Sequence, residues 1–198
     1  MKFLTFTDLH ADKTLLKELV SRASKEDIDF LVCCGDISIF GKGLRHTLKE
    51  LNSLNKKVYV LPGNHESDEM MTKAVADLSN CENIHRKAVE IDDYIFLGYG
   101  EDGFSQKDPE FRKISREWYG KYNGRKIVLV THGPAYGTKA DRLEKTHAGN
   151  IDYRNFVERI KPKLMISGHL HETVGAVDTI GKTKVINPGW EGMVIELK

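Results

Sequence analysis

The segment Val58-Tyr59-Val60-Leu61-Pro62-Gly63-Asn64-His65-Glu66 joins a short apolar run to a polar cluster. Residues 58–61 predict a buried strand. Pro62 and Gly63 predict its end, because proline cannot continue a strand ladder and the pair favours a turn. The polar residues 64–66 therefore follow the strand at once. In a parallel sheet they would lie at the carboxyl edge, where α/β proteins gather their ligand sites.

Four further polar clusters follow apolar runs in the same way. They are Asp8-Leu9-His10, Gly35-Asp36, Thr131-His132-Gly133 and Gly168-His169-Leu170-His171. Borderline divalent cations prefer imidazole nitrogen and carboxylate or amide oxygen as ligands. The five clusters supply enough of them for two coordination spheres that share one ligand. The sequence thus predicts a two-metal site in a metal-dependent hydrolase.

The patterns between the clusters alternate between strand and helix. Strands are predicted at residues 2–7, 30–34, 58–61, 126–130 and 164–167, with more β structure at 173–180, 184–186 and 193–197. Helices are predicted at 13–23, 44–54, 68–78, 110–119 and 151–160, a hairpin at 87–91 and 94–99, and a long loop at 132–150. This alternation favours an α/β fold. No repeat or linker interrupts residues 1–198, so we expect a single domain.

The composition is that of a compact enzyme. The chain has 198 residues, of which 40% are hydrophobic and 30% charged, with a formal net charge of +1. Its basic residues are scattered, so no dedicated nucleic-acid surface is expected. No apolar stretch approaches the roughly 18 residues of a membrane helix, and Asp8 comes too early for a signal peptide. Cys33, Cys34 and Cys81 make no even disulfide framework. We expect a cytoplasmic protein with no membrane segment.

The ordered set D-x-H, G-D, G-N-H-E, a single His and G-H-x-H resembles the pattern of the calcineurin-like metallophosphoesterase superfamily. It runs from Asp8 to His171. Any one element is weak evidence, whereas five in order are specific. The resemblance implies an α/β fold in which a two-sheet β-sandwich is flanked by helices, giving four layers in the order αββα. It also implies a cofactor of two divalent metal ions.

The resemblance assigns roles to individual residues. It implies that the first metal is held by Asp8, His10, Asp36 and His171, and the second by Asp36, Asn64, His132 and His169. His65 would be the catalytic histidine, acting from outside the ligand set.

Each of these residues also has a simpler interpretation. Asp8 and His10 are two residues apart, so in an extended chain both side chains point to the same side. Such a pair can also be two polar side chains that face water at the end of a strand. Asp36 after Gly35 is suited to bridging two cations, or to bonding nearby backbone amides in a turn. Asn64 could complete a metal sphere or cap the helix that follows it.

The loop after His132 carries a second likeness. With its downstream Asp141 and His147, the Thr131-His132-Gly133-Pro134 segment resembles a family subgroup that includes relatives of the brain-type cyclic-nucleotide phosphodiesterases. On this likeness Asp141 and His147 would shape the substrate end of the site. The alternative is a loop whose polar side chains face water. The other two histidines, His46 and His85, are expected to be solvated.

The expected function is hydrolysis of phosphodiester bonds in small substrates by a metal-bridging hydroxide, with His65 stabilising charge or protonating the leaving oxygen. One alternative is a phosphomonoesterase or nucleotide pyrophosphatase with the same centre. Another is a non-catalytic interaction scaffold, with aromatic side chains of residues 94–99 or 118–119 as its surface. The mixed ligand set suits Mn, Fe, Co, Ni or Zn better than Ca, and we favour Mn. The expected partner is a small phosphate ester.

Overall fold

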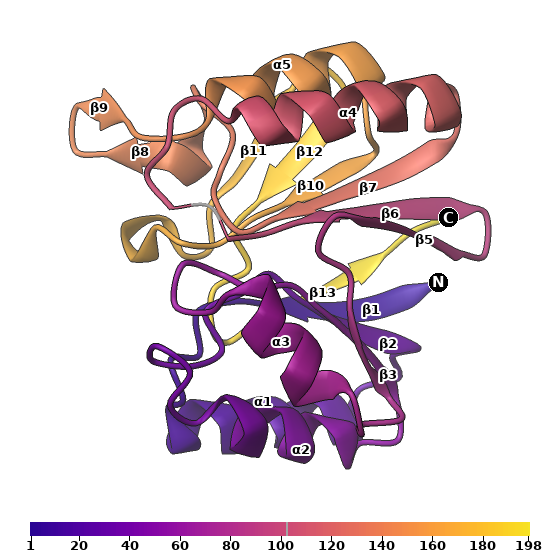
Figure 1. Cartoon of the computed structure of the whole chain (residues 1–198), viewed down its shortest axis with the longest axis vertical. Helices are drawn as coiled ribbons and strands as arrows, with labels where there is room; N and C mark the ends of the chain where they lie inside the picture. The colour runs from indigo at the N-terminus through magenta and orange to yellow at the C-terminus, as the bar shows by residue number, and fades with distance from the viewer. Residues whose placement is uncertain (102) are drawn as a thin grey trace.

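Two β-sheets lie face to face at the centre of the computed structural model, and helices cover their outer faces (Figure 1). The structure describes residues 1–101 and 103–198. Figure 1 shows α1, α2 and α3 below the lower sheet and α4 and α5 above the upper one. The four layers therefore follow the order helix, sheet, sheet, helix, as expected from the sequence.

The first sheet has the strand order β13-β1-β2-β3-β4. Its strands are β1 (Lys2–Phe6), β2 (Phe30–Cys33), β3 (Lys57–Val60), β4 (Cys81–Asn83) and β13 (Met193–Glu196). Strands β1 to β4 are parallel, and β13 adds antiparallel to β1. The helices that cover it are α1 (Lys13–Lys25), α2 (Leu44–Asn52) and α3 (Asp68–Val75). The β-α-β-α-β order predicted for this half is confirmed.

The second sheet has the order β11-β12-β10-β7-β6-β5. Its strands are β5 (Lys87–Ile91), β6 (Tyr94–Tyr99), β7 (Lys126–Thr131), β10 (Leu164–Ile166), β11 (Val177–Ile180) and β12 (Thr183–Ile186). The predicted hairpin of β5 and β6 is present, and β6, β7, β10 and β12 run parallel. The covering helices are α4 (Pro109–Tyr122) and α5 (Ile151–Ile160).

Side-chain alternation explains why these strands are apolar throughout. In β1, Leu4 packs among the helices of the first layer, whereas Phe3 faces the second sheet. Phe3 stacks on Phe30 with ring centroids 5.0 Å apart and meets Phe96 of the opposite sheet edge to face at 5.6 Å. Because both faces of each central strand are buried, a near-continuous hydrophobic run is required.

Polar side chains set the starts of the helices. Asp12 accepts hydrogen bonds from the backbone N–H groups of Thr14 and Leu15, and Ser67 accepts one from Met70 at the start of α3. At α4, Asp108 caps the helix and Pro109 lies in its first turn. Proline has no N–H group, but N–H groups in the first turn make no hydrogen bond within the helix, so none is lost. These caps fix where the loops before α1, α3 and α4 end, whereas α2 begins after Gly43 without a side-chain cap.

Several predictions about the fold were wrong. Residues 173–180 are not one strand: a 3-10 turn, η2 (His171–Thr173), comes first and β11 begins at Val177. The three-residue strand β4 was missed, because Cys81-Glu82-Asn83 has no apolar run. The loop 132–150 contains a 3-10 turn, η1 (Lys139–Asp141), and a small hairpin of β8 (Arg142–Leu143) and β9 (Thr146–His147).

Two predictions concerned the exposure of side chains. His46 is exposed as expected, but His85 is buried, because its Nδ1 accepts a hydrogen bond from the backbone N–H of Gly100 at 2.8 Å. Tyr94, Tyr99 and Trp118 are buried, so these rings belong to the core and offer no partner surface. Of the helices described, none combines the length and apolar character needed to cross a membrane.

Candidate metal centre

Five loops that leave the carboxyl ends of five strands meet at one edge of the sandwich. The first sheet supplies Asp8 and His10 after β1, Asp36 after β2, and Asn64 and His65 after β3. The second sheet supplies His132 after β7, and His169 and His171 after β10. The structure brings these eight predicted residues together in one continuous cluster.

Asp36 lies at the middle of the cluster. Its Oδ2 atom is 3.5 Å from Nε2 of His132, 3.8 Å from Nε2 of His10 and 3.9 Å from Nε2 of His65. The carboxylate is almost fully buried. Its other oxygen, Oδ1, accepts a hydrogen bond from the backbone N–H of His65 at 2.9 Å. Asp36 therefore bonds a distant loop rather than the nearby amides of a simple turn, and keeps one oxygen directed at three imidazoles.

His10, His171 and Asp8 form one side of the cluster. The two imidazole Nε2 atoms are 3.2 Å apart, and His171 Nε2 is 3.8 Å from Asp8 Oδ1. Ligand atoms of these three residues lie within 4.8 Å of one another. Two ring nitrogens directed at the same point, with a carboxylate beside them, are the arrangement that imidazole and oxygen ligands take around a cation.

His132, Asn64 and His169 form the other side. Nδ1 of His132 is 2.8 Å from the carbonyl oxygen of Cys34, to which it donates. This leaves Nε2 directed at the site, 3.0 Å from Oδ1 of Asn64. A backbone acceptor behind the ring is the usual way in which proteins orient a metal-binding histidine. The helix after Asn64 is capped by Ser67, so the interpretation of Asn64 as an N-cap was wrong.

Unsatisfied buried atoms show that this donor set suits cations. Oδ1 of Asp8 and Nε2 of His169 are buried and have no hydrogen-bond partner among the described residues. Leaving a buried polar atom without a partner costs about 1–3 kcal/mol, so such atoms call for an explanation. Both are electron-pair donors placed in a cluster of other donors. A divalent cation would satisfy such atoms, so the residues present fit the binding of divalent metal ions.

The electrostatics of the cluster place a protonated His132 beside an ionised Asp36, with His169 neutral. Burial, and next the neighbouring His132, lowers the pKa of His169 to about 4. Burial alone would lower the pKa of His132, but Asp36 outweighs it and raises that pKa to about 9. Burial would likewise raise the pKa of Asp36, yet His132 lowers it to about 2. The Asp36–His132 pair thus holds a proton when no cation is bound, and cation binding competes with that proton.

The backbone at the cluster is bent rather than extended. Asp8, His10, Asp36 and His169 all have positive φ angles, between 46° and 70°. The expectation that Asp8 and His10 share one side of an extended chain was therefore wrong, although both reach the site. Positive φ is uncommon outside glycine and is concentrated at functional sites.

Glycines allow the loops to approach one another closely. A β-carbon at Gly63 would overlap the carboxylate of Asp36, and one at Gly168 would overlap the hydroxyl of Thr7 and crowd Asp8. The glycine that precedes each of these polar clusters is needed for contact between loops, not only for a turn.

Glu66 is a residue of the site whose role sequence reasoning missed. Its buried carboxylate accepts hydrogen bonds from the backbone N–H groups of Asp36 and Gly63, each at 3.1 Å, and from the N–H and hydroxyl of Ser38 at 2.7 and 2.6 Å. It thereby joins the loops after β2 and β3. Its place at the end of Gly63-Asn64-His65-Glu66 was the available signal, but its partners Asp36 and Ser38 are distant in sequence.

Asp141 and His147 lie outside the cluster. Asp141 is fully buried and accepts hydrogen bonds from the backbone N–H groups of Gly137, Thr138 and Gly149 at 2.8–3.1 Å. It also lies 2.8 Å from Nδ1 of His147. Neither residue is among the described side chains that line the hollow over the histidines. Asp141 therefore orders its own loop, and contact with substrate stays a prediction for both.

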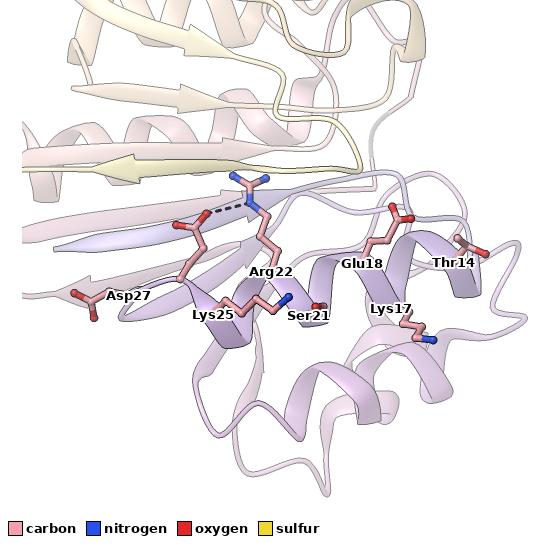
Figure 2. Close-up of a pocket in the computed structure, with 8 residues that line it drawn as sticks. Thr14, Lys17, Glu18, Ser21, Arg22, Lys25 and Asp27 are labelled. Carbon is pink, nitrogen blue, oxygen red and sulfur yellow. Dashed lines mark hydrogen bonds and ion pairs between the residues drawn. The ribbon is translucent and has the colours of Figure 1, made fainter.

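Two hollows differ in what they could bind. One of about 300 Å³ lies over the cluster and is lined by His10, Asp36, Asn64, His65, Phe104, Leu143, His169, Leu170, His171 and Glu172. A larger one, of about 860 Å³, runs along α1 between side chains such as Lys17, Arg22 and Asp27 (Figure 2). The larger hollow contains no histidine, and its Arg22 already pairs with Glu26 at 3.3 Å. The candidate metal ligands line the smaller one.

Comparison with known proteins agrees with this geometry. A family model described as calcineurin-like phosphoesterase matches residues 1–173. An uncharacterized protein of Methanocaldococcus jannaschii is 33% identical over 201 residues, which cover 95% of this chain and 88% of the relative.

Solved structures share the fold at low sequence identity. A Thermus thermophilus protein has a TM-score of 0.77 at 13% identity, covering 96% of this chain and 90% of its own. A dimetal phosphatase from Danio rerio has a TM-score of 0.65 at 13% identity, covering 94% and 86%. A novel archaeal phosphodiesterase has a TM-score of 0.57 at 18% identity, covering 96% and 84%.

The family match spans all five loops that meet at the cluster, which places the protein among the metallophosphoesterase hydrolases. The chain belongs to the calcineurin-like phosphoesterase family. The expected two-sheet α/β fold flanked by helices is confirmed.

Proposed function

We propose that this protein hydrolyses phosphodiester bonds of small substrates with two divalent cations. Asp8, His10, Asp36 and His171 would hold the first cation, and Asp36, Asn64, His132 and His169 the second. The observation that carries the proposal is the single Asp36 oxygen directed at three imidazole nitrogens, with Asp8 Oδ1 and His169 Nε2 buried and unsatisfied beside it. Bound there, cations supply Lewis acidity, offset the charge of phosphate and lower the pKa of water.

The chain itself positions the reacting groups. Glu66 holds the loops of Asp36 and His65 together, and the Cys34 carbonyl fixes the ring of His132. His65 lines the hollow with its side chain 21% exposed and its Nε2 atom 3.9 Å from the Asp36 carboxylate. It is thus placed to donate a hydrogen bond or proton to the leaving oxygen of a bound ester.

The charge of the hollow favours diesters. No lysine or arginine is found among the described residues that line it, whereas Glu172 is. A monoester carries a second negative charge next to phosphorus, and this site offers no side-chain cation to balance it. A diester carries one negative charge, so it needs less compensation from side chains than a monoester does.

A phosphomonoesterase or nucleotide pyrophosphatase is the second candidate, since the same centre would serve it and a dimetal phosphatase shares the fold. A non-catalytic scaffold is a weaker one, because most of its proposed aromatic surface is buried and only Tyr119 is half-buried. Manganese is our favoured metal, with Fe, Zn, Ni and Co as alternatives. We also propose a cytoplasmic location and a small phosphate ester as the partner.

The test is hydrolysis of bis(p-nitrophenyl) phosphate beside p-nitrophenyl phosphate by metal-stripped protein resupplied with Mn, Ni, Co, Zn or Mg. We expect cation-dependent cleavage of the diester and little of the monoester. Cleavage of the monoester alone would favour the second candidate. Two bound cations without cleavage of either ester would favour the scaffold.

A further inference from the structure

Two exposed phenylalanines stand against histidines of the site. Phe40 is 74% exposed and stacks on His65, with ring centroids 4.3 Å apart and planes 17° apart. Phe104 is 70% exposed and meets His169 edge to face at 4.4 Å. They are the most exposed large apolar side chains that the structure describes. They come from separate loops, after β2 and after β6.

The backbone at Phe40 is strained for this side chain. Ile39 and Lys42 exchange two backbone hydrogen bonds, at 3.2 and 2.9 Å, around a two-residue turn. The two turn residues, Phe40 and Gly41, have φ angles of 49° and 82°. Turns with positive φ at both central positions favour Asn-Gly, because most side chains crowd the backbone there. An exposed phenylalanine is an unfavourable choice for folding, and such outliers concentrate at functional sites.

The hollow between the histidines has an apolar side. Phe104, Leu143 and Leu170 line it together with the predicted metal ligands. Phe40 is not among the described lining residues but stacks on His65, which is one of them. Its volume of about 300 Å³ is at the lower end of the range for small-molecule sites. A phosphate group needs the polar side alone, so the apolar side is available to the organic group of the ester.

We infer that Phe40 and Phe104 select substrates whose esterified group carries a planar ring, aryl or nucleobase, which packs on their exposed faces. This inference rests on the proposed function, since it names the substrate class of the same site. An aromatic ring stacks on phenylalanine whatever its substituents, and such stacking accounts for about 5- to 150-fold in affinity per ring. Phe40 and Phe104 thus set specificity for the ring, while the polar cluster binds phosphate.

The competing interpretation is that the two rings only hold His65 and His169 in place. Phosphonates separate the two, because they present a phosphoryl group to the same cations but contain no cleavable ester bond. The probes share one phosphonate group, so the ratio of their affinities isolates the contribution of the ring. The experiment measures calorimetric affinities of Mn-loaded protein for phenylphosphonate, methylphosphonate and the acyclic adenine phosphonate tenofovir. The variants are Phe40→Ala, Phe104→Ala and Phe40→Trp, the last of which keeps an aromatic ring at position 40. The number of bound Mn ions per chain is measured in each variant.

We expect wild type to bind phenylphosphonate about tenfold more tightly than methylphosphonate, in line with the stacking of one ring. Each alanine variant should reduce this ratio towards one and leave methylphosphonate affinity and Mn content unchanged. Phe40→Trp should restore the ratio. Ile39→Ala removes an exposed side chain from the same turn and should keep the tenfold preference. Tenofovir bound more tightly than phenylphosphonate would identify nucleobases as the ring, and the reverse order would identify aryl groups.

The inference is overturned if wild type shows no preference for the ring, or if the alanine variants weaken both phosphonates equally. Its failure is distinct from that of the proposed function. Ring preference without hydrolysis of any ester would refute the function alone, whereas hydrolysis without ring preference would refute ring selection alone.

Discussion

Oδ2 of Asp36 and Nε2 of His132 lie 3.5 Å apart, although Asp36 follows a strand of one sheet and His132 a strand of the other. The candidate metal centre therefore lies between the two sheets, and its geometry depends on how they pack.

Replacing Asp36 with asparagine should abolish the centre while preserving its shape. Loss of a group that merely supports a ligand typically costs 10- to 100-fold in metal affinity or activity, so loss of a shared ligand should exceed about 100-fold. Metal titration and diester hydrolysis measure this. Asp92→Asn, at an exposed turn, is the matched control and should behave as wild type. Full activity in Asp36→Asn would remove Asp36 from the ligand set.

His65→Ala should separate metal binding from turnover. Because His65 is placed to assist the leaving group, we expect both cations to be retained and kcat to fall about 10²- to 10⁴-fold. Elemental analysis and steady-state kinetics give the two quantities. His46→Ala replaces an exposed histidine of α2 and should change neither. Loss of one cation in His65→Ala would instead make His65 a ligand.

Glu66→Ala should destabilise the protein strongly. It leaves the backbone N–H groups of Asp36, Ser38 and Gly63 without their acceptor, and each buried unsatisfied donor costs about 1–3 kcal/mol. A loss of about 3 kcal/mol corresponds to a fall in Tm of about 10 °C for a chain of this size. Thermal unfolding measures it, with the exposed Glu69→Ala as control. A change below about 1 °C would show that the carboxylate is dispensable.

Phe40→Asn should raise stability and weaken ring selection together. Asparagine tolerates positive φ, and relief of the strain at Phe40 is expected to contribute about 1 kcal/mol, or about 3 °C in Tm. The same variant should lose the preference for phenylphosphonate. Thermal unfolding and calorimetry on one preparation test both. An unchanged or lower Tm would argue that the turn is not strained by its side chain.

The three cysteines should resist modification in the folded protein. Burial raises the pKa of Cys33 and Cys34 well above the usual range and that of Cys81 to about 11. Thiolates are the reactive form, so at about pH 8 Ellman's reagent should react with all three only after unfolding. Above about pH 9 the unfolded chain loses thiol protons that the folded chain keeps, so stability should fall there as pH rises. Rapid labelling of native protein would contradict this.

Strand ends were predictable from the sequence because apolar runs and the polar clusters after them are local signals. This is why Asp36, Asn64 and His132 were correctly expected at one edge. The path of the chain beyond the strands was not predictable. Asp8 and His10 have positive φ because neighbouring loops pack against them. The alternation of apolar and polar residues in the sequence does not reveal such packing.

Residues that act through distant partners were the ones missed. Glu66 bonds the loop after β2, and His85 is buried because Gly100 donates to it. The exposed ring of Phe40 looks like any apolar residue in the sequence. Only its position beside His65, on a strained turn, separates it from the core phenylalanines.

The most direct test of the two-metal account is a titration of metal-stripped protein with Mn²⁺, following bound metal and bis(p-nitrophenyl) phosphate hydrolysis in the same samples. If two cations act together, the stripped protein should be inactive and activity should reach its plateau at two bound ions per chain. Asp36→Asn should lose both metal binding and activity. Hydrolysis that persists in fully stripped protein, or that reaches its plateau at one ion per chain, would contradict it.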